Sequence, residues 1–472
     1  MSFHQGPAIQ TKEQWLGKSL SHLPTPSVVI DRAIYIQNCK RMLQAARNNG
    51  MSFRIHIKTH KTSEGTRLQL DPYQNEAGGE DGIEKSNRRL IISTVEEGWM
   101  LVNSGTIEDY QVSSVLYSMP PSPNTLQRLA SLRTALQERK CDLLLMVDHP
   151  AQAKAVESLP RGDTSEWSVF IKVDAGYHRA GVPLHTQQFE ETVKAVLEYS
   201  ATSLYGFYVH AGNSVSGTTM SLSEDGQLMP SNSQYSATSQ TEASSYLDGE
   251  IQAVSEASKL AREIIAGDTK LRGRYSERSF VLSVGATPTA NAALIQSEDG
   301  KLVHGLPNDH DELELHAGNY AIYDLQQLAT SMISEVQIAL FVLSSVCSVY
   351  PGRSSDVGEA LCDAGGLAMS KDRGPIPGFG KVRSDEQQGL DGWYLGRVSQ
   401  EHGILTYSTP KEFSSASVRL PEYGEQLRIL PQHACMTLAN HPWFYIVDSS
   451  LETGKNWQDW VVRDIWTPAK FW

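Results

Sequence analysis

A chain of 472 residues is too long for one ordinary hydrophobic core, so we expect two domains or a large barrel with an appendage. Its 41 Lys and Arg residues against 54 Asp and Glu residues give a formal charge of −13, which argues against nucleic acid or an anionic membrane as a partner. The sequence has no apolar run of the roughly 18–20 residues that span a bilayer, no N-terminal secretory pattern and no C-terminal peroxisomal address. Five scattered cysteines without framework spacing suit a reducing compartment, and we expect the cytoplasm.

Short apolar segments alternate with amphipathic segments through the N-terminal two thirds of the chain. Segments 96–104, 124–138 and 186–199 carry apolar residues at helical spacing. Eight strands that alternate with helices predict an α/β fold, a (β/α)8 barrel, over residues 24–314. The predicted strands are 27–31, 53–58, 89–95, 113–119, 142–148, 167–173, 204–211 and 280–286.

Two insertions interrupt this alternation, and after it the sequence pattern changes from alternating strands and helices to strands alone. Residues 74–87 are rich in Gly and acidic residues and predict a surface loop, whereas 213–245 are mostly Ser, Thr, Asn, Gln and Gly and predict a disordered excursion. Beyond residue 315 the segments are β-rich, lack helical periodicity and are separated by turns rich in Gly and Pro. We therefore predict a C-terminal all-β domain over 315–472, which the N-terminal segment 1–23 is expected to join.

The second predicted strand carries the first candidate catalytic group. In FRIHIKTHK the alternation places two isoleucines on one face and His56, Lys58 and His60 on the other. The apolar face of a barrel strand lies under the helices, so Lys58 should point into the barrel mouth. Partial burial and two neighbouring imidazoles would favour the neutral amine that Schiff-base formation needs. A solvated strand edge with three surface cations is the alternative, and the spacing alone favours it.

The sixth and seventh predicted strands end in polar side chains. Asp174, Tyr177 and Arg179 directly follow the sixth strand, at the rim where barrels place catalytic residues. The seventh strand presents Tyr208 and His210 on one face. Taken alone, His210 is better interpreted as a structural histidine.

The eighth predicted strand ends in SVGATPTAN. The small residues Gly285 and Ala286 would let backbone N–H groups approach an anion, and Thr287 adds a hydroxyl. The loops after the last two strands are where barrels most often hold a phosphate. We therefore predict a phosphate-binding turn here.

A histidine and a cysteine in the C-terminal domain form a candidate metal site. In an extended segment His433 and Cys435 would project on the same side. One imidazole and one thiolate suit zinc, and two protein ligands would leave open positions for water or substrate. A buried cysteine beside an incidental histidine is the alternative that the spacing alone favours.

Together these segments carry a family resemblance over nearly the whole chain. The sequence resembles the D-serine dehydratase and D-threonine aldolase family, which shares the alanine-racemase-like barrel, fold type III of the pyridoxal-phosphate (PLP) enzymes. The resemblance implies a PLP-binding barrel, a β domain and a homodimer. The segments that carry it, in chain order, are LPTPSVVID, RIHIKTHK, KVDAGYHRAGV, YVHAGNSV, VGATPT, LHAGNYAIYD, CDAGG and PQHAC.

The resemblance also implies roles for individual residues. Lys58 would be the catalytic lysine that carries PLP, and Arg179 would lie beside the cofactor ring. His433 and Cys435 would be the zinc pair. The implied cofactor-binding residues are Lys58, Tyr177, Arg179, Tyr208, His210, Gly285, Ala286 and Thr287.

The implied activity is that of a PLP- and zinc-dependent lyase, a D-serine ammonia-lyase that converts D-serine to pyruvate and ammonia. A D-threonine aldolase and a D-threo-3-hydroxyaspartate dehydratase are alternatives on the same scaffold. A metal-dependent barrel hydrolase would use His56 and His60, although Lys58 between them makes joint ligation awkward. A non-catalytic PLP-carrier barrel is a further alternative, and the second domain argues against it.

Overall fold

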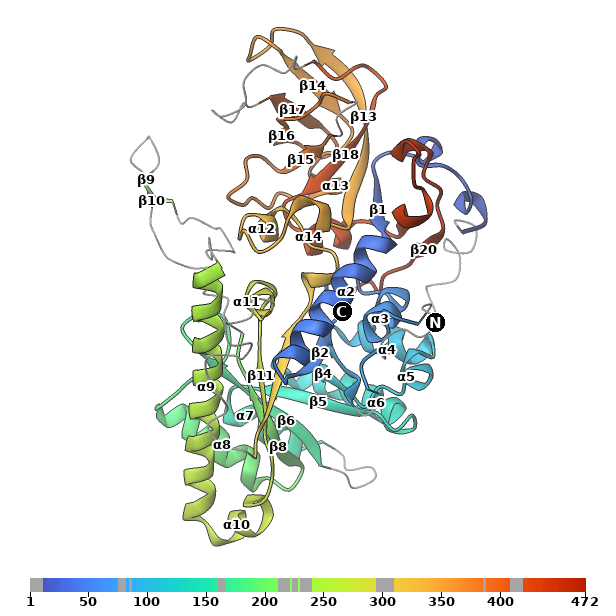
Figure 1. Ribbon diagram of the computed structural model, residues 1–472. Coiled ribbons are helices and arrows are strands. Elements are labelled where there is room, and N and C mark those ends of the chain that lie inside the picture. Colours follow the sequence, from blue (N-terminus) through green and yellow to red (C-terminus); the bar gives the residue numbers. More distant parts are fainter. Residues whose placement is uncertain are drawn as a thin grey trace. The chain divides into compact units, whose positions relative to one another are not determined.

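The computed structural model describes residues 12–74, 82–84, 87–159, 166–210, 221–222, 228–229, 240–293, 310–384, 388–407 and 419–472. The chain divides into two units (Figure 1). The barrel unit comprises Cys39–Gly217, Ser236–Tyr320 and Ala469–Trp472, and the β unit comprises Met1–Asn38, Thr218–Tyr235 and Ala321–Pro468. No helix in the described part of the chain is long and apolar enough to cross a membrane.

The barrel unit is built on a closed parallel sheet. Within the described residues, eight parallel strands pair in chain order, and the ring closes where β12 pairs with β2. This confirms the predicted (β/α)8 barrel. The strands are β2 (Ser52–His56), β3 (Arg89–Ile92), β4 (Ser114–Tyr117), β5 (Asp142–Val147), β6 (Trp167–Asp174), β8 (Thr202–Tyr208), β11 (Val281–Val284) and β12 (Glu312–Ala317), and the short β7 (Val182–Pro183) extends β6.

The helices begin and bury residues as their sequences dictate. In α8 (Gln187–Glu198) the Thr186 hydroxyl accepts a hydrogen bond from the Phe189 N–H, and the buried residues recur at helical spacing. The long α9 (Gln240–Gly267), green in Figure 1, packs against β11 and α11 (Thr287–Ala292). The other helices of this unit are α3 (Ser63–Leu70), α4 (Val95–Asn103), α5 (Thr106–Asp109), α6 (Pro123–Gln137), α7 (Pro150–Glu157), α9 (Gln240–Gly267), α10 (Thr269–Tyr275) and α11 (Thr287–Ala292), while α2 (Arg32–Asn48) runs across the division between the units.

The assignment of two strands was wrong. The predicted first barrel strand, 27–31, is β1 (Ser27–Asp31), which pairs with β13 (Leu340–Tyr350) and β19 (Phe444–Val447) in the β unit. All five residues of β1 are buried, and a short apolar run does not reveal which sheet it joins. The eighth barrel strand is β12, which a domain boundary at residue 314 would cut. As a result Lys58 follows the first barrel strand, and the Gly285 turn follows the seventh.

The predicted insertions fall mostly outside the described residues. In the second insertion β9 (Ser221–Leu222) pairs antiparallel with β10 (Leu228–Met229), and residues 240–245 begin α9 instead of being disordered. Alanine and glutamate in QTEAS favour a helix despite the serines around them.

The β unit has an antiparallel closed sheet at its centre, as the prediction of a C-terminal all-β domain requires. In the part of the chain that the structure describes, β13 pairs with both β18 and β14, so six strands form a ring. Strands β1, β19 and β20 continue the sheet from β13. The elements are β13 (Leu340–Tyr350), β14 (Glu359–Cys362), β15 (Gly380–Arg383), β16 (Trp393–Val398), β17 (Gly403–Tyr407), β18 (Gln426–Pro431), β19 (Phe444–Val447), β20 (Asp464–Trp466), α12 (Leu325–Leu328), α13 (Gly366–Met369) and α14 (Ala434–Asn440).

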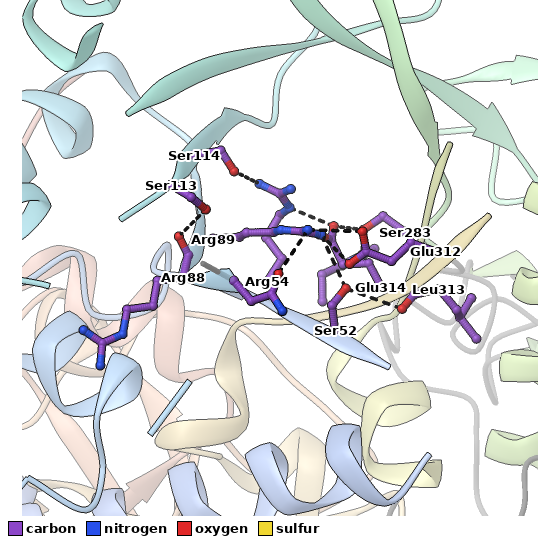
Figure 2. Close-up of polar contacts among 12 residues, drawn as sticks. Ser52, Arg54, Arg88, Arg89, Ser113, Ser114, Ser283, Glu312, Leu313 and Glu314 are labelled. Atoms are coloured by element: carbon purple, nitrogen blue, oxygen red, sulfur yellow. Dashed lines mark hydrogen bonds and ion pairs between the residues drawn. The ribbon is translucent and has the colours of Figure 1, made fainter. Parts of the chain in front are cut away.

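A buried ion-pair network fills part of the barrel interior (Figure 2). The Glu314 carboxylate lies 2.7 Å from Arg54 Nε and 2.9 Å from Arg89 Nη1. Arg89 also contacts Glu312 at 2.8 Å, and Arg54 Nη1 donates to the Ser114 hydroxyl. The side chains of Arg54 and Glu314 are fully buried. Charges of opposite sign therefore meet inside the barrel, away from solvent.

Candidate active site

A cavity of about 270 Å³ lies at the carboxyl ends of the barrel strands. This is the end at which barrels carry catalytic groups. Its lining comes from residues at or just beyond the ends of β2, β3, β4, β6, β8, β11 and β12. The lining residues are His56, Lys58, Ser93, Ser118, Met119, Pro120, Lys172, Arg179, Ala180, Tyr208, His210, Ala286, Thr287, His316, Ala317 and Gly318.

Lys58 lies in this cavity, two residues beyond the end of β2. Its neighbours Ile55 and Ile57 are fully buried, as the predicted alternation requires, and the lysine itself is half-buried. Its backbone N–H is 3.4 Å from His56 Nδ1. A Cβ on Gly318 would lie 3.6 Å from the Lys58 Cε, so the chain after β12 passes close to the lysine stem.

Positive charge predominates in the described lining of the cavity. Of the described residues that line it, Lys58, Lys172 and Arg179 are cationic and none is a carboxylate. Burial, followed by Arg179 and Lys58, lowers the pKa of Lys172 to about 8, although Asp148 and Asp174 raise it in part. An unfavourable energy of this kind is relieved when a negatively charged ligand binds.

Three histidines in the lining are held neutral. Burial is the main cause that lowers the pKa of His316 to about 3 and the pKa values of His56 and His210 well below the ordinary value, and Lys58 lowers all three further. His210 Nδ1 lies 2.8 Å from the Gly285 carbonyl oxygen, which can only accept, so Nδ1 carries the proton. These rings offer hydrogen bonds without adding charge.

The predicted phosphate turn borders the cavity. Ala286 and Thr287 line it. Gly285 has φ of +137°, and a Cβ there would lie 2.2 Å from the His316 carbonyl oxygen. Only glycine fits this close approach of two strand ends. The Ala286 N–H already donates to the Thr289 hydroxyl at 2.7 Å, so an anion would have to use other donors of the turn.

Some residues of the barrel unit that the sequence singled out lie outside the lining, among them Asp174, Gly285, Tyr177 and His60. Tyr177 is half-buried, and the Arg179 guanidinium lies 5.0 Å from the centre of its ring. His60 is buried and bonds to Thr62 and Gln69, because the chain turns after Lys58 and leaves the barrel interior. The structure therefore gives His60 a structural role and separates it from His56.

Sequence reasoning missed Lys172 and His316. A lysine in the otherwise apolar run WSVFIKV was a signal for the first. The second lies in the quoted segment LHAGNYAIYD, but β12 was not recognised as a barrel strand. The His316 ring stacks on Tyr208 at 4.1 Å between centroids, inside the cavity.

The histidine–cysteine pair lies in the β unit, where the expected extended segment is wrong. His433 immediately precedes α14, and Cys435 is in the first turn of that helix. The two side chains still hydrogen-bond, and His433 Nδ1 lies 2.5 Å from Asp372 Oδ2. Burial would lower the pKa of His433, but Asp372 and Cys435 raise it to about 11. Among the described residues no group of three His, Cys, Asp or Glu side chains is arranged to hold a metal ion.

Comparisons with known proteins agree with this architecture. The model of the alanine racemase N-terminal domain matches residues 114–262, and that of the serine dehydratase domain matches residues 339–447. The D-serine dehydratase of Schizosaccharomyces pombe is 36% identical over 98% of this chain and 95% of that protein.

Solved structures with the same fold include two variants of a D-threo-3-hydroxyaspartate dehydratase. One is a histidine-to-alanine variant with a TM-score of 0.70 and 26% identity, covering 97% of each chain. The other is a cysteine-to-alanine variant in the metal-free form, substituted two positions further along, with a TM-score of 0.67 and 26% identity over 96% of this chain and all of that chain.

The barrel, its lysine-bearing mouth and the domain matches define an enzyme with the alanine-racemase-like fold, a lyase by its relatives. The identity to the D-serine dehydratase of the yeast Schizosaccharomyces pombe extends over nearly the full length of both proteins. The chain belongs to the D-serine dehydratase family.

Proposed function

We propose that the protein is a PLP-dependent D-serine ammonia-lyase that converts D-serine to pyruvate and ammonia. The observation that carries the proposal is Lys58 in a cavity whose described lining has three cationic side chains and no carboxylate. The membership of the chain in the D-serine dehydratase family supports the choice of substrate.

The residues present fit PLP. Its aldehyde needs an amine, which Lys58 offers, and its phosphate and the carboxylate of an amino acid need positive charge, which Lys172 and Arg179 offer. Gly285 provides a turn that a side chain would block. When bound, PLP supplies an electron sink for the charge that develops at the substrate Cα.

The chain's own groups would bind the substrate and move its protons. Lys58 is the candidate general base for the Cα proton, because it is the half-buried amine of the lining. Lys172 is more deeply buried and lies 5.6 Å from the Tyr208 ring centre. We assign to it the binding of a negatively charged group of the ligand, because it is a cation of the lining. Neutral His56 and His210 would orient the ligand without competing with the cations for it.

We propose that His433 and Cys435 hold zinc. One nitrogen and one sulfur donor suit this ion, and Asp372 on His433 Nδ1 leaves Nε2 for the metal. The dehydratase relative that is metal-free carries its cysteine substitution two positions after the histidine of the other variant, which is the spacing of His433 and Cys435. Bound zinc supplies Lewis acidity to an oxygen ligand.

A D-threo-3-hydroxyaspartate dehydratase is the second candidate. Its substrate has a second carboxylate, which a cavity with a cationic described lining and no carboxylate in that lining would accept. The similarity of the fold to a dehydratase for that substrate supports this alternative.

Product identification separates these candidates. The purified protein is incubated with D-serine, D-threonine and D-threo-3-hydroxyaspartate. We expect pyruvate from D-serine at the highest kcat/KM. Faster oxaloacetate from the hydroxyaspartate would replace the proposal with the second candidate, and glycine with acetaldehyde from D-threonine would show an aldolase.

We also propose a homodimer in the cytoplasm. Light scattering of the purified protein and fractionation of the source cells measure these two properties. A monomeric mass or an organellar fraction would contradict them.

A further inference from the structure

The inward face of β12 connects the ion-pair network to the cavity. Successive inward positions of a strand are two residues apart, so Glu312, Glu314 and His316 share one face. Glu314 belongs to the network, and His316 lines the cavity (Figure 2 shows the network end). Ser283 on β11 lies between them. Its hydroxyl is 2.8 Å from Glu314 Oε1 and 3.0 Å from His316 Nδ1.

The charge of Glu314 decides the direction of the first hydrogen bond. Burial alone would raise the pKa of Glu314, but Arg54 and Arg89 lower it to about 2. The carboxylate is therefore ionised at neutral pH and can only accept. The Ser283 hydroxyl has one proton, so it donates that proton to Glu314.

The second hydrogen bond then fixes the tautomer of His316. With its proton committed, Ser283 Oγ must accept from Nδ1 of the imidazole. His316 is neutral, because burial lowers its pKa to about 3. A neutral ring with a proton on Nδ1 has an unprotonated Nε2, which is an acceptor.

This acceptor is available to a ligand. His316 is 2% exposed, and its Nε2 has no hydrogen-bond partner among the described residues. Stacking on Tyr208, with 14° between the ring planes, restricts rotation of the imidazole. A buried acceptor without a partner is costly, and a ligand that donates to it removes that cost.

We propose that Glu314 and Ser283 are positioning residues that hold His316 as a neutral Nε2 acceptor, and that this atom accepts a hydrogen bond from the ring N–H of the bound pyridine cofactor. The identity of the ligand as PLP rests on the proposed function. The tautomer of His316 rests only on its hydrogen bond with Ser283 and on the charge of Glu314. A neutral acceptor stabilises a protonated ring nitrogen less than a carboxylate would, and it leaves the anion-binding charge of the cavity unchanged.

The tautomer is tested first, by nitrogen NMR of the holoenzyme labelled with ¹⁵N-histidine. His316 is assigned by the signals that disappear in His316→Gln. We expect a protonated Nδ1 and an unprotonated Nε2 between pH 6 and 8. A proton on Nε2 in the unmodified enzyme overturns the proposal, so the test stands even if a variant fails to fold.

A pair of serine variants then tests the positioning. Ser283→Ala should give a mixture of tautomers at His316. Ser114→Ala is the matched control, because it removes a hydrogen bond to Arg54 in the same network without touching His316. Equal spectra for the two variants would overturn the role of Ser283.

The ligand contact is tested with PLP labelled at its ring nitrogen. His316→Phe should shift the ring-nitrogen signal toward the unprotonated form, and His316→Gln, whose amide oxygen can accept, should restore most of the wild-type signal. An unchanged signal in His316→Phe overturns the contact. Absence of bound PLP would instead refute the proposed function and leave the measured tautomer of His316 standing.

Discussion

The two polar clusters of the barrel interior treat charge in opposite ways. In the ion-pair network Arg54 and Arg89 meet Glu312 and Glu314, and hydrogen bonds to serines complete the cluster. In the cavity the described lining sets Lys58, Lys172 and Arg179 against no carboxylate at all. Strands β2 and β12 contribute residues to both clusters. The identity of the strand therefore does not explain why one cluster pairs its charges and the other does not.

The difference separates structure from binding. Buried charges that satisfy each other form a fixed support, and their removal costs stability. Cations that gather around one cavity without a carboxylate partner in its described lining raise the free energy of the empty site, and a ligand of opposite sign lowers it again. The network therefore has the properties of a scaffold and the cavity those of an anion-binding site.

The largest expected effect tests the scaffold. Glu314→Ala leaves two buried guanidinium groups without their shared partner, so we expect the free energy of unfolding to fall by about 3–5 kcal/mol in a urea titration. Glu312→Ala is the matched control, because that side chain is 36% exposed and its ion pair is worth at most about 1 kcal/mol. Similar losses for the two variants would mean that the network does not act as a buried scaffold.

The next effect tests the cavity. Lys172→Met removes one buried cation from the lining, and we expect PLP affinity to fall by about 1.5–3 kcal/mol, roughly tenfold to a hundredfold. Lys194→Met makes the same change of net charge on the exposed face of α8 and should leave affinity unchanged. Fluorescence titration measures the PLP affinity of both variants. An equal loss of affinity in the two variants would show that the net charge of the protein, not the cavity, attracts the cofactor.

The β unit adds a third case to the comparison, in which the His433 imidazole is paired with the Asp372 carboxylate. Asp372→Ala removes the carboxylate that orients His433, and we expect zinc affinity to fall by about 10- to 100-fold.

Cys435→Ala should abolish stoichiometric zinc and most D-serine turnover while it retains PLP. Cys347→Ala, at an exposed free cysteine, is the control. Full zinc content and turnover in Cys435→Ala would show that the pair is structural.

The smallest effect concerns pH. Lys172 has a pKa of about 8 in the folded protein, against 10.5 ordinarily, so it loses its proton as the pH rises from 7 to 9. PLP affinity, measured in Lys58→Ala to exclude covalent attachment, should fall several-fold over this range. The stability of the ligand-free protein should instead rise between pH 8 and 10.5, because only the unfolded chain still binds this proton. Both trends should vanish in Lys172→Met, and their persistence would assign them to another group.

The sequence predicted the barrel because seven of its strands are apolar runs with helical segments between them. It failed at β12, where inward-facing Glu312 and Glu314 break the apolar pattern, and at β1, whose apolar run joins the other sheet. The partners of a buried charge can come from strands that are neighbours in the sheet but far apart in the sequence, so no local pattern reveals that Arg54 neutralises Glu314.

The sequence pointed to residues of the candidate site where the signal is local. Alternation along one strand made Lys58 a candidate, which the family resemblance then favoured, and small residues at a strand end pointed to the turn at Gly285. His316 was missed together with its strand. Asp372 was missed because 61 residues separate it from His433. The contact of Asp372 with His433 is created only when the chain folds.

The most direct test of the account uses the two lysines that share the cavity. The protein is loaded with PLP and reduced with borohydride, and the labelled peptide is sequenced. The account predicts one cofactor per chain, fixed to Lys58. Label on Lys172, or on no residue of the cavity, would contradict it.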